Sequence, residues 1–139
     1  MTTQQLEFVV RWGDCDPAGI IYYPTYYRWM DAGTWALLAA AGYDGDTMRA
    51  EHCTIPLVDS QCSFISSPRF GDACVVRSAL TRCGRSSFKV EHEFLRLRDH
   101  ALLARGYESR VWCRYSAGPG TTLRSAPLPQ ALRAVLRPT

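Results

Sequence analysis

Residues 11–24 read RWGDCDPAGIIYYP and place two carboxylates, Asp14 and Asp16, directly before an apolar segment. Pro17 fixes its own φ and favours an extended Asp16, while Gly19 tolerates a positive φ, so these residues predict a tight turn. Without further information, an Asp-x-Asp-Pro turn is most often a cap or a turn-stabilising pair. The local pattern therefore predicts structure first and leaves a chemical role for either aspartate open.

The segment after this turn predicts a long helix over residues 24–41. Pro24 suits the first helical position, and Gly42 suits the stop after the last turn. Apolar residues recur at three- and four-residue steps, and the opposite side is also apolar: Tyr26, Trp29, Met30, Gly33, Leu37 and Ala40 against Tyr27, Trp35 and Leu38. A helix that is apolar almost all round is expected to be buried.

The rest of the chain reads mainly as strands. A first strand is expected over residues 6–12, and a short helix over 46–52. Four more strands follow, over residues 55–65, 73–82, 87–96 and 107–115, and a short terminal helix is expected over 128–136. Because the connections between the later strands are short, antiparallel pairing is favoured. The predicted fold class is α+β, with one long helix enclosed by a curved antiparallel sheet of about five strands.

Length and charge narrow the function classes. The 139 residues predict a single domain, 1–139, with a core of its own. A net charge of +3 is too small to predict nucleic-acid binding. No apolar run approaches the roughly 20 residues of a membrane span, and the first residues lack the layout of a signal peptide. We therefore expect a cytoplasmic protein without a membrane or nucleic-acid partner.

Cysteines and histidines do not form a recognisable metal or redox motif. The six cysteines include no C-x-x-C pair and are expected to be free thiols. Cys15 has no histidine nearby to act as a base, so a packed, inert thiol is expected there. His92 shares a strand face with Phe88 and Phe94 and is expected to be packed and hydrogen-bonded.

A longer string carries a family resemblance. GDCDPAGI at residues 13–20, followed by Tyr23-Pro24, Tyr26 and RWMDA at residues 28–32, closely resembles the 4-hydroxybenzoyl-CoA thioesterases, which are hotdog-fold acyl-CoA thioesterases. The resemblance implies a helix wrapped by an antiparallel sheet, in agreement with the pattern above. It also implies a homodimer or homotetramer with active sites between subunits, and a reaction that needs no cofactor and no metal.

The resemblance assigns the second aspartate of the turn to catalysis. The residue matching Asp16 acts on the thioester carbon, either as a nucleophile or as a base on water, and the sequence does not choose between these. The backbone amide matching Tyr23, at the start of the helix, holds the developing oxyanion. Asp14 is expected instead to satisfy backbone donors or to pair with Arg11.

Two further groups are implied to bind substrate. A basic turn between two strands binds the nucleotide end of coenzyme A in this family, and its counterpart here contains Arg82, Arg85 and Ser86. The family's turn holds two arginines and a lysine, whereas Gly84 and Ser86 stand at two of those positions here. Asp31 matches the aspartate that accepts a hydrogen bond from the substrate's phenolic hydroxyl.

Asp31 also has a purely structural interpretation, an ion pair with Arg28 three residues earlier on the same helix. At the level of the whole protein, the predicted function is hydrolysis of an aromatic acyl-CoA. A short- or medium-chain aliphatic acyl-CoA thioesterase and a non-catalytic acyl-CoA binder are the alternatives. A hotdog hydratase is disfavoured because no histidine occurs between Met1 and Glu51.

Overall fold

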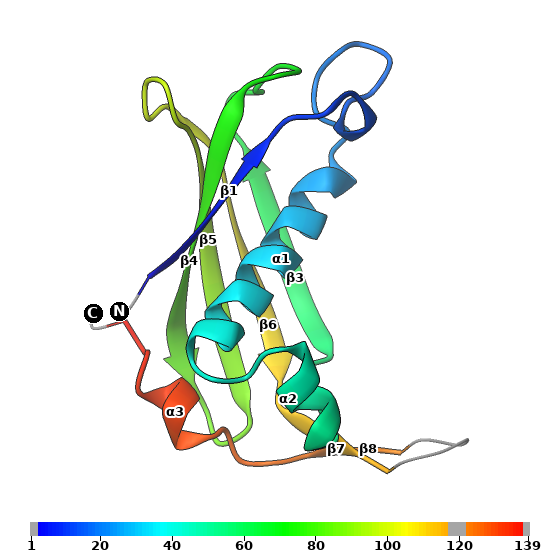
Figure 1. The fold of residues 1–139 in the computed structure, drawn as a ribbon, viewed down its shortest axis with the longest axis vertical. Helices are drawn as coiled ribbons and strands as arrows, with labels where there is room; N and C mark the ends of the chain where they lie inside the picture. The colour runs from blue at the N-terminus through cyan, green and yellow to red at the C-terminus, as the bar shows by residue number, and fades with distance from the viewer. Residues whose placement is uncertain (1–2, 117–121, 138–139) are drawn as a thin grey trace.

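A computed structural model describes residues 3–116 and 122–137 of the chain. Its main feature is a five-stranded sheet crossed on one face by a long helix (Figure 1). In chain order the elements are β1 (Gln4–Val9), a 3₁₀ turn (Trp12–Asp14), α1 (Pro24–Ala40), α2 (Gly45–Ala50), β2 (Cys53–Thr54), β3 (Leu57–Phe64), β4 (Ala73–Cys83), β5 (Ser87–Arg96), β6 (Leu102–Val111), β7 (Cys113–Tyr115), β8 (Leu123–Ser125) and α3 (Gln130–Arg133).

The main sheet has the strand order β1-β4-β5-β6-β3, and every neighbouring pair is antiparallel. β5 lies at its centre and shows the alternation that the sequence predicted: Phe88, Val90, His92 and Phe94 are all buried beneath α1. The apolar side chains between helix and sheet form two clusters, one around Tyr26 and Phe94 and one around Leu38 and Trp112. The predicted α+β arrangement of helix and antiparallel sheet is confirmed.

Two glycines allow the helix to lie close to the sheet. A Cβ on Gly33 of α1 would collide with the hydroxyl of Ser78, and a Cβ on Gly106 of β6 would collide with the sulfur of Met30. These contacts bring the middle of α1 directly over β4, β5 and β6. The same close approach places Thr34 of α1 within hydrogen-bonding distance of buried polar groups on the sheet.

In the single chain, the predicted burial of α1 is confined to the side that faces the sheet. Met30, Thr34 and Leu38 are buried against the sheet, whereas Arg28 and Asp31 are exposed. The aromatic side chains of the other side are half-buried rather than enclosed. A single five-stranded sheet covers one face of a helix, because its strands cannot also reach round to the other face.

Several element boundaries also differ from the prediction. The strand expected over residues 107–115 begins earlier, at Leu102, and is interrupted at the buried Trp112. After the interruption, β7 leaves the main sheet and forms a second, three-stranded sheet of order β2-β7-β8. The terminal helix is shorter than expected. Gly118 and Pro119 in the tail predict a turn, and this turn lies outside the described residues.

Candidate active site

The turn between the 3₁₀ segment and α1 is a small closed loop. Cys15 and Ile21 form an isolated antiparallel bridge, and the Asp16 N–H donates to the Ile20 carbonyl at 2.8 Å. The Gly19 N–H donates a hydrogen bond to the Asp16 carbonyl at 2.9 Å, and Gly19 has a φ of 81°. This positive φ is the conformation that glycine adopts without steric cost, so the predicted turn is confirmed.

The Asp16 side chain is held by one oxygen only. Its Oδ1 accepts a hydrogen bond from the Ala18 N–H at 2.8 Å, and Oδ2 has no hydrogen-bond donor among the described residues. The residue is half-buried. One oxygen therefore fixes the orientation of the carboxylate while the other stays open to a ligand or a water molecule.

Asp14, two residues earlier, is buried and fully engaged. Its Oδ2 accepts from the Arg11 N–H at 2.9 Å, and its Oδ1 accepts from Arg28 Nη2 at 2.8 Å. Its carbonyl accepts from the Tyr22 N–H at 2.9 Å and from the Thr25 hydroxyl at 3.2 Å. The predicted backbone role is confirmed, but the charged partner is Arg28 rather than Arg11. Asp14 fastens the turn to the first turn of α1.

Tyr23 is the residue immediately before α1, and its ring is exposed. Its backbone N–H donates to no acceptor in residues 3–116 and 122–137. The next residue, Pro24, has no N–H, so the Tyr23 amide is the first donor of the helix start. A free amide at a helix N-terminus attracts negative charge, because the helix dipole adds to its own polarity.

An apolar cavity opens beside this turn. It has a volume of about 250 Å³ and is lined by residues of the turn, the start of α1 and the end of β3, including Ile20, Tyr23, Tyr26, Phe64 and Ile65. Its walls carry no ionisable carboxylate or amine, so it suits an uncharged group. A second cavity of about 570 Å³ is lined by residues of β1, the 3₁₀ segment and α1, including the charged Arg11, Asp14 and Arg28.

The structure gives Asp31 a partner that the sequence did not indicate. Arg110 Nη2 on β6 donates to Asp31 Oδ1 at 2.8 Å. Arg28, the partner expected from the i,i+3 spacing, instead pairs with Asp14. The prediction of an ion pair between Asp31 and Arg28 is therefore wrong. Asp31 Oδ2 accepts no hydrogen bond from the described residues, and the side chain is exposed.

Arg110 is buried, and a second carboxylate accompanies it. Burial alone would lower the pKa of Arg110, but hydrogen bonds and charge from Glu108 and Asp31 raise it. Burial alone would raise the pKa of Glu108, but the polar contacts of His92, Arg110 and Thr34 lower it to about 2. Both groups are therefore charged at neutral pH. A buried pair of this kind is retained only when its hydrogen bonds are satisfied.

The predicted coenzyme A turn joins β4 to β5, far from Asp16 in sequence. Arg82 and Arg85 are both exposed, and Ser86 is half-buried. Arg82 faces Lys89 across the β4–β5 pair, and both line a cavity of about 170 Å³. The sequence did not single out Lys89, which could have been found only from the register of the two strands. Arg85 and Ser86 lie at the tip of the turn, outside that cavity.

The C-terminal segment holds this turn in place. Arg133 of α3 donates through Nη2 to the carbonyl of Gly84 at 2.7 Å and to that of Arg85 at 3.1 Å. The Leu128 N–H also donates to the Arg85 carbonyl, at 2.8 Å. The backbone of the turn is therefore anchored, and Arg133 adds a positive charge beside it.

The surroundings of the cysteines and of His92 indicate structural roles rather than catalytic ones. All six cysteines are free. Burial, with the charges of Asp14 and Asp16, raises the pKa of the Cys15 thiol, so this residue is not an activated nucleophile. His92 is buried, with Nδ1 2.8 Å from the Ser78 hydroxyl, as predicted. His52 lies at φ 53° after α2 and lines none of the cavities described above.

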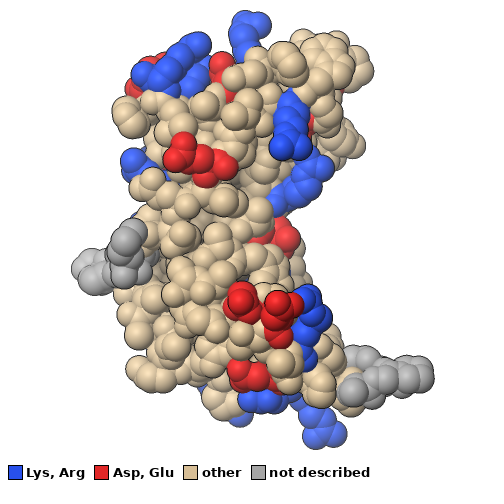
Figure 2. All heavy atoms as spheres, in the orientation of Figure 1, with Lys and Arg blue, Asp and Glu red and all other residues tan. Residues whose placement is uncertain are grey.

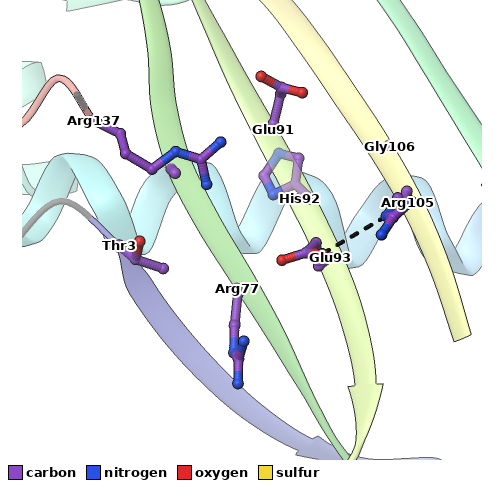
Figure 3. Close-up of a pocket in the computed structure, with 9 residues that line it drawn as sticks. Thr3, Arg77, Glu91, His92, Glu93, Arg105, Gly106 and Arg137 are labelled. Carbon is purple, nitrogen blue, oxygen red and sulfur yellow. Dashed lines mark ion pairs between the residues drawn. The ribbon is translucent and has the colours of Figure 1, made fainter. Parts of the chain in front are cut away.

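A further cavity of about 460 Å³ lies on the sheet face remote from α1 (Figure 3). Its walls mix arginines and glutamates, including Arg77, Arg137 and Glu91, and Arg105 pairs there with Glu93 at 3.7 Å. None of the residues implied in thioester chemistry lines it. In the described residues, no three His, Cys, Asp or Glu side chains are grouped to hold a metal ion. No helix there has the length and hydropathy of a membrane span.

Comparison with known proteins finds relatives over most of the chain. The family model of the thioesterase-like superfamily matches residues 10–136. The 4-hydroxybenzoyl-CoA thioesterase of Pseudomonas sp. (strain CBS-3) is 29% identical over 132 residues, covering 91% of this chain and 89% of that protein. The 1,4-dihydroxy-2-naphthoyl-CoA hydrolase of Synechococcus sp. (strain WH7803) is 28% identical over 131 residues, covering 88% and 81%.

A solved structure extends the likeness to three dimensions. The gentisyl-coenzyme A thioesterase BH1999 superposes with a TM-score of 0.82 at 30% identity, covering 94% of this chain and 99% of that one. The predicted hotdog fold and the predicted resemblance are confirmed by these matches.

Proposed function

Because this chain belongs to the thioesterase-like superfamily, we propose that it is an acyl-CoA thioesterase whose substrate carries an aromatic acyl group. The names of the three relatives share one substrate class, a coenzyme A thioester of a hydroxylated aromatic acid. The observation that carries the proposal is a half-engaged carboxylate at Asp16 in the turn before α1, followed by a free amide at Tyr23 at the start of α1, where an apolar cavity opens.

In this proposal, the thioester carbonyl lies between the two groups. The open oxygen of Asp16 attacks the carbonyl carbon, or removes a proton from the water that does so. The Tyr23 N–H donates to the oxygen that gains negative charge, and one such donor is worth about 3 kcal/mol to the transition state. The apolar cavity excludes water from the acyl group, which strengthens both interactions.

The two ends of the substrate bind elsewhere. We assign the ring hydroxyl to Asp31, whose Oδ2 is open, and the phosphates of coenzyme A to Arg82, Arg85 and Ser86, with Lys89 added by its place beside Arg82. No step of this mechanism needs a cofactor or a metal. The free state of all six cysteines supports a reducing compartment, and we place the enzyme in the cytoplasm.

The test of the function is a steady-state assay over a panel of acyl-CoA thioesters with thiol release as the readout. We expect the highest kcat/KM for a hydroxybenzoyl or related aromatic thioester. A maximum at a short- or medium-chain aliphatic thioester would replace the aromatic assignment. Binding of acyl-CoA without release of free coenzyme A would identify a non-catalytic binder.

Arg85→Ala is expected to raise KM by roughly three- to tenfold with little change in kcat, because an exposed contact to a phosphate contributes to binding rather than to chemistry. The effect should shrink as salt rises, since an exposed charge pair is screened. Arg98→Ala, an exposed arginine in the β5–β6 turn, is the matched control. An unchanged KM for full-length thioesters would remove Arg85 from the phosphate site.

We expect the protein to assemble through the free edge of β3. Within residues 3–116 and 122–137, β3 pairs only with β6, and its exposed side chains include Leu57, Val58 and Phe64. Side chains other than Lys, Arg, Asp and Glu form most of the surface around α1 (Figure 2). A free sheet edge of eight residues, with apolar side chains exposed at both of its ends, favours pairing with another strand.

Light scattering at micromolar concentration should therefore give at least twice the 15.6 kDa of one chain. Val58→Lys should shift the protein towards the monomer, whereas Val9→Lys, on the opposite edge strand β1, should shift it less. A wild type that scatters as a single chain would contradict this assembly.

A further inference from the structure

The ion pair of Asp31 and Arg110 joins an exposed carboxylate to a buried guanidinium. The side chains are 52% and 8% exposed, and 2.8 Å separates the paired atoms. An ion pair that is open to solvent at one end contributes little to stability. The cost of burying the arginine therefore points to a role beyond joining α1 to β6.

Arg110 is fixed in one orientation by groups other than Asp31. Its Nε donates to Glu108 Oε1 at 3.0 Å and its Nη2 to Glu108 Oε2 at 2.9 Å. Its Nη1 donates to the Ile55 carbonyl at 2.8 Å. This two-pronged pairing removes rotational freedom from the guanidinium. The N–H that reaches Asp31 therefore points in a set direction.

Glu108 is itself anchored to the helix and the sheet. The Thr34 hydroxyl of α1 donates to its Oε1, and His92 Nε2 of β5 lies 3.6 Å from the same oxygen. The other nitrogen of His92 lies 2.8 Å from the Ser78 hydroxyl of β4. Thr34 is three residues after Asp31 on α1. The network therefore starts and ends on α1, is closed through β6, and branches to β5 and β4.

The charges of this network favour one kind of ligand at Asp31. Two carboxylates, Asp31 and Glu108, and one guanidinium together leave one net negative charge. The open oxygen Oδ2 of Asp31 is an acceptor. A hydroxyl group can donate to it, whereas a carboxylate or an unsubstituted ring cannot.

We propose that Arg110, braced by Glu108, is a positioning residue that presents Asp31 to the acyl group and sets the preference for a hydroxylated ring. The inference rests on the proposed function of Asp31 as the acceptor of that hydroxyl. A lone aspartate on an exposed helix face samples several rotamers, and ordering it on binding costs affinity. Arg110 holds the carboxylate in one rotamer before the substrate arrives.

The experiment compares kcat/KM for 4-hydroxybenzoyl-CoA and benzoyl-CoA. Arg110→Met alone leaves Glu108 charged and buried, which can prevent folding. Arg110→Met/Glu108→Gln removes both charges together, so the double variant is the main test. The control is Arg105→Met/Glu93→Gln, which removes an ion pair between β6 and β5 on the sheet face remote from α1, where Arg105 is 64% exposed.

We expect the preference for the hydroxylated substrate to fall about tenfold in the Arg110 double variant, with kcat/KM for benzoyl-CoA within about threefold of wild type. The Arg105 double variant should keep the wild-type preference. In an Asp31→Ala background, the Arg110 changes should have no further effect on the preference, since their target is gone. If Arg110 and Glu108 served only the fold, the double variant would lower kcat/KM for both substrates together.

Two results overturn the inference. One is an Arg110 double variant that keeps the full preference, and the other is a wild type that hydrolyses both thioesters equally. A third result, a wild type that hydrolyses no acyl-CoA, is distinguishable from these two. It would contradict the proposed function itself, and the inference about Arg110 would fall with it.

Discussion

Asp16→Asn will lower kcat by at least about 100-fold while acyl-CoA still binds, because a positioned carboxylate contributes 10²–10⁴-fold as a base and more as a nucleophile. Asparagine keeps the shape of the side chain and its acceptor for the Ala18 N–H, which is donated at 2.8 Å in the wild type. It loses the negative charge that attacks the carbonyl or activates water. Chemistry is therefore affected far more than recognition.

The measurement combines steady-state kcat with the Kd of the variant for an acyl-CoA, determined by calorimetry. Cys15→Ser is the control for the neighbouring side chain and should keep kcat within a few-fold, since the Cys15 thiol is not ionised. Asp14→Asn should lower the unfolding temperature, because it removes the charge that Arg28 contacts. Near-normal kcat in Asp16→Asn would transfer the catalytic role to another group.

Asp31→Ala will abolish a preference of about 10- to 100-fold for 4-hydroxybenzoyl-CoA over benzoyl-CoA. A hydrogen bond to a charged acceptor is worth about 1.5–3 kcal/mol, and here it is made only with the hydroxylated substrate. Hydrolysis of benzoyl-CoA should be nearly unchanged, because the reacting carbonyl is held at the other end of the acyl group by Asp16 and Tyr23.

The measurement is kcat/KM for both substrates with both proteins. Asp46→Ala, an exposed aspartate on α2, is the control and should leave the preference intact. If the wild type shows no preference, or if Asp31→Ala keeps it, an unsubstituted or aliphatic acyl group becomes the better substrate assignment. Thioester hydrolysis by Asp16 could still be correct in that case, because the two predictions test different ends of the substrate.

The local sequence determined the elements around the site. The Asp-Pro-Ala-Gly turn, the start of α1 at Pro24 and the alternation along β5 could all be predicted, since each depends on residues within a few positions of one another. Backbone restriction by proline and glycine acts on neighbouring residues, and the periods of helix and strand repeat within a short window. The family resemblance placed Asp16, Tyr23 and Asp31 in roles that composition and periodicity could not supply.

Tertiary structure decided which charged groups meet. Arg110 reaches Asp31 across 79 residues of sequence, and Arg28 turns to Asp14 rather than to its helical neighbour. Lys89 joins Arg82 only because of the register between β4 and β5. Which side chains pair depends on how closely the helix packs on the sheet. Gly33 and Gly106 allow this close packing, because a Cβ at either position would collide with a neighbouring side chain. The order of residues determined the turn and the helix, whereas the close approach of α1 to the sheet determined the partner of Asp31.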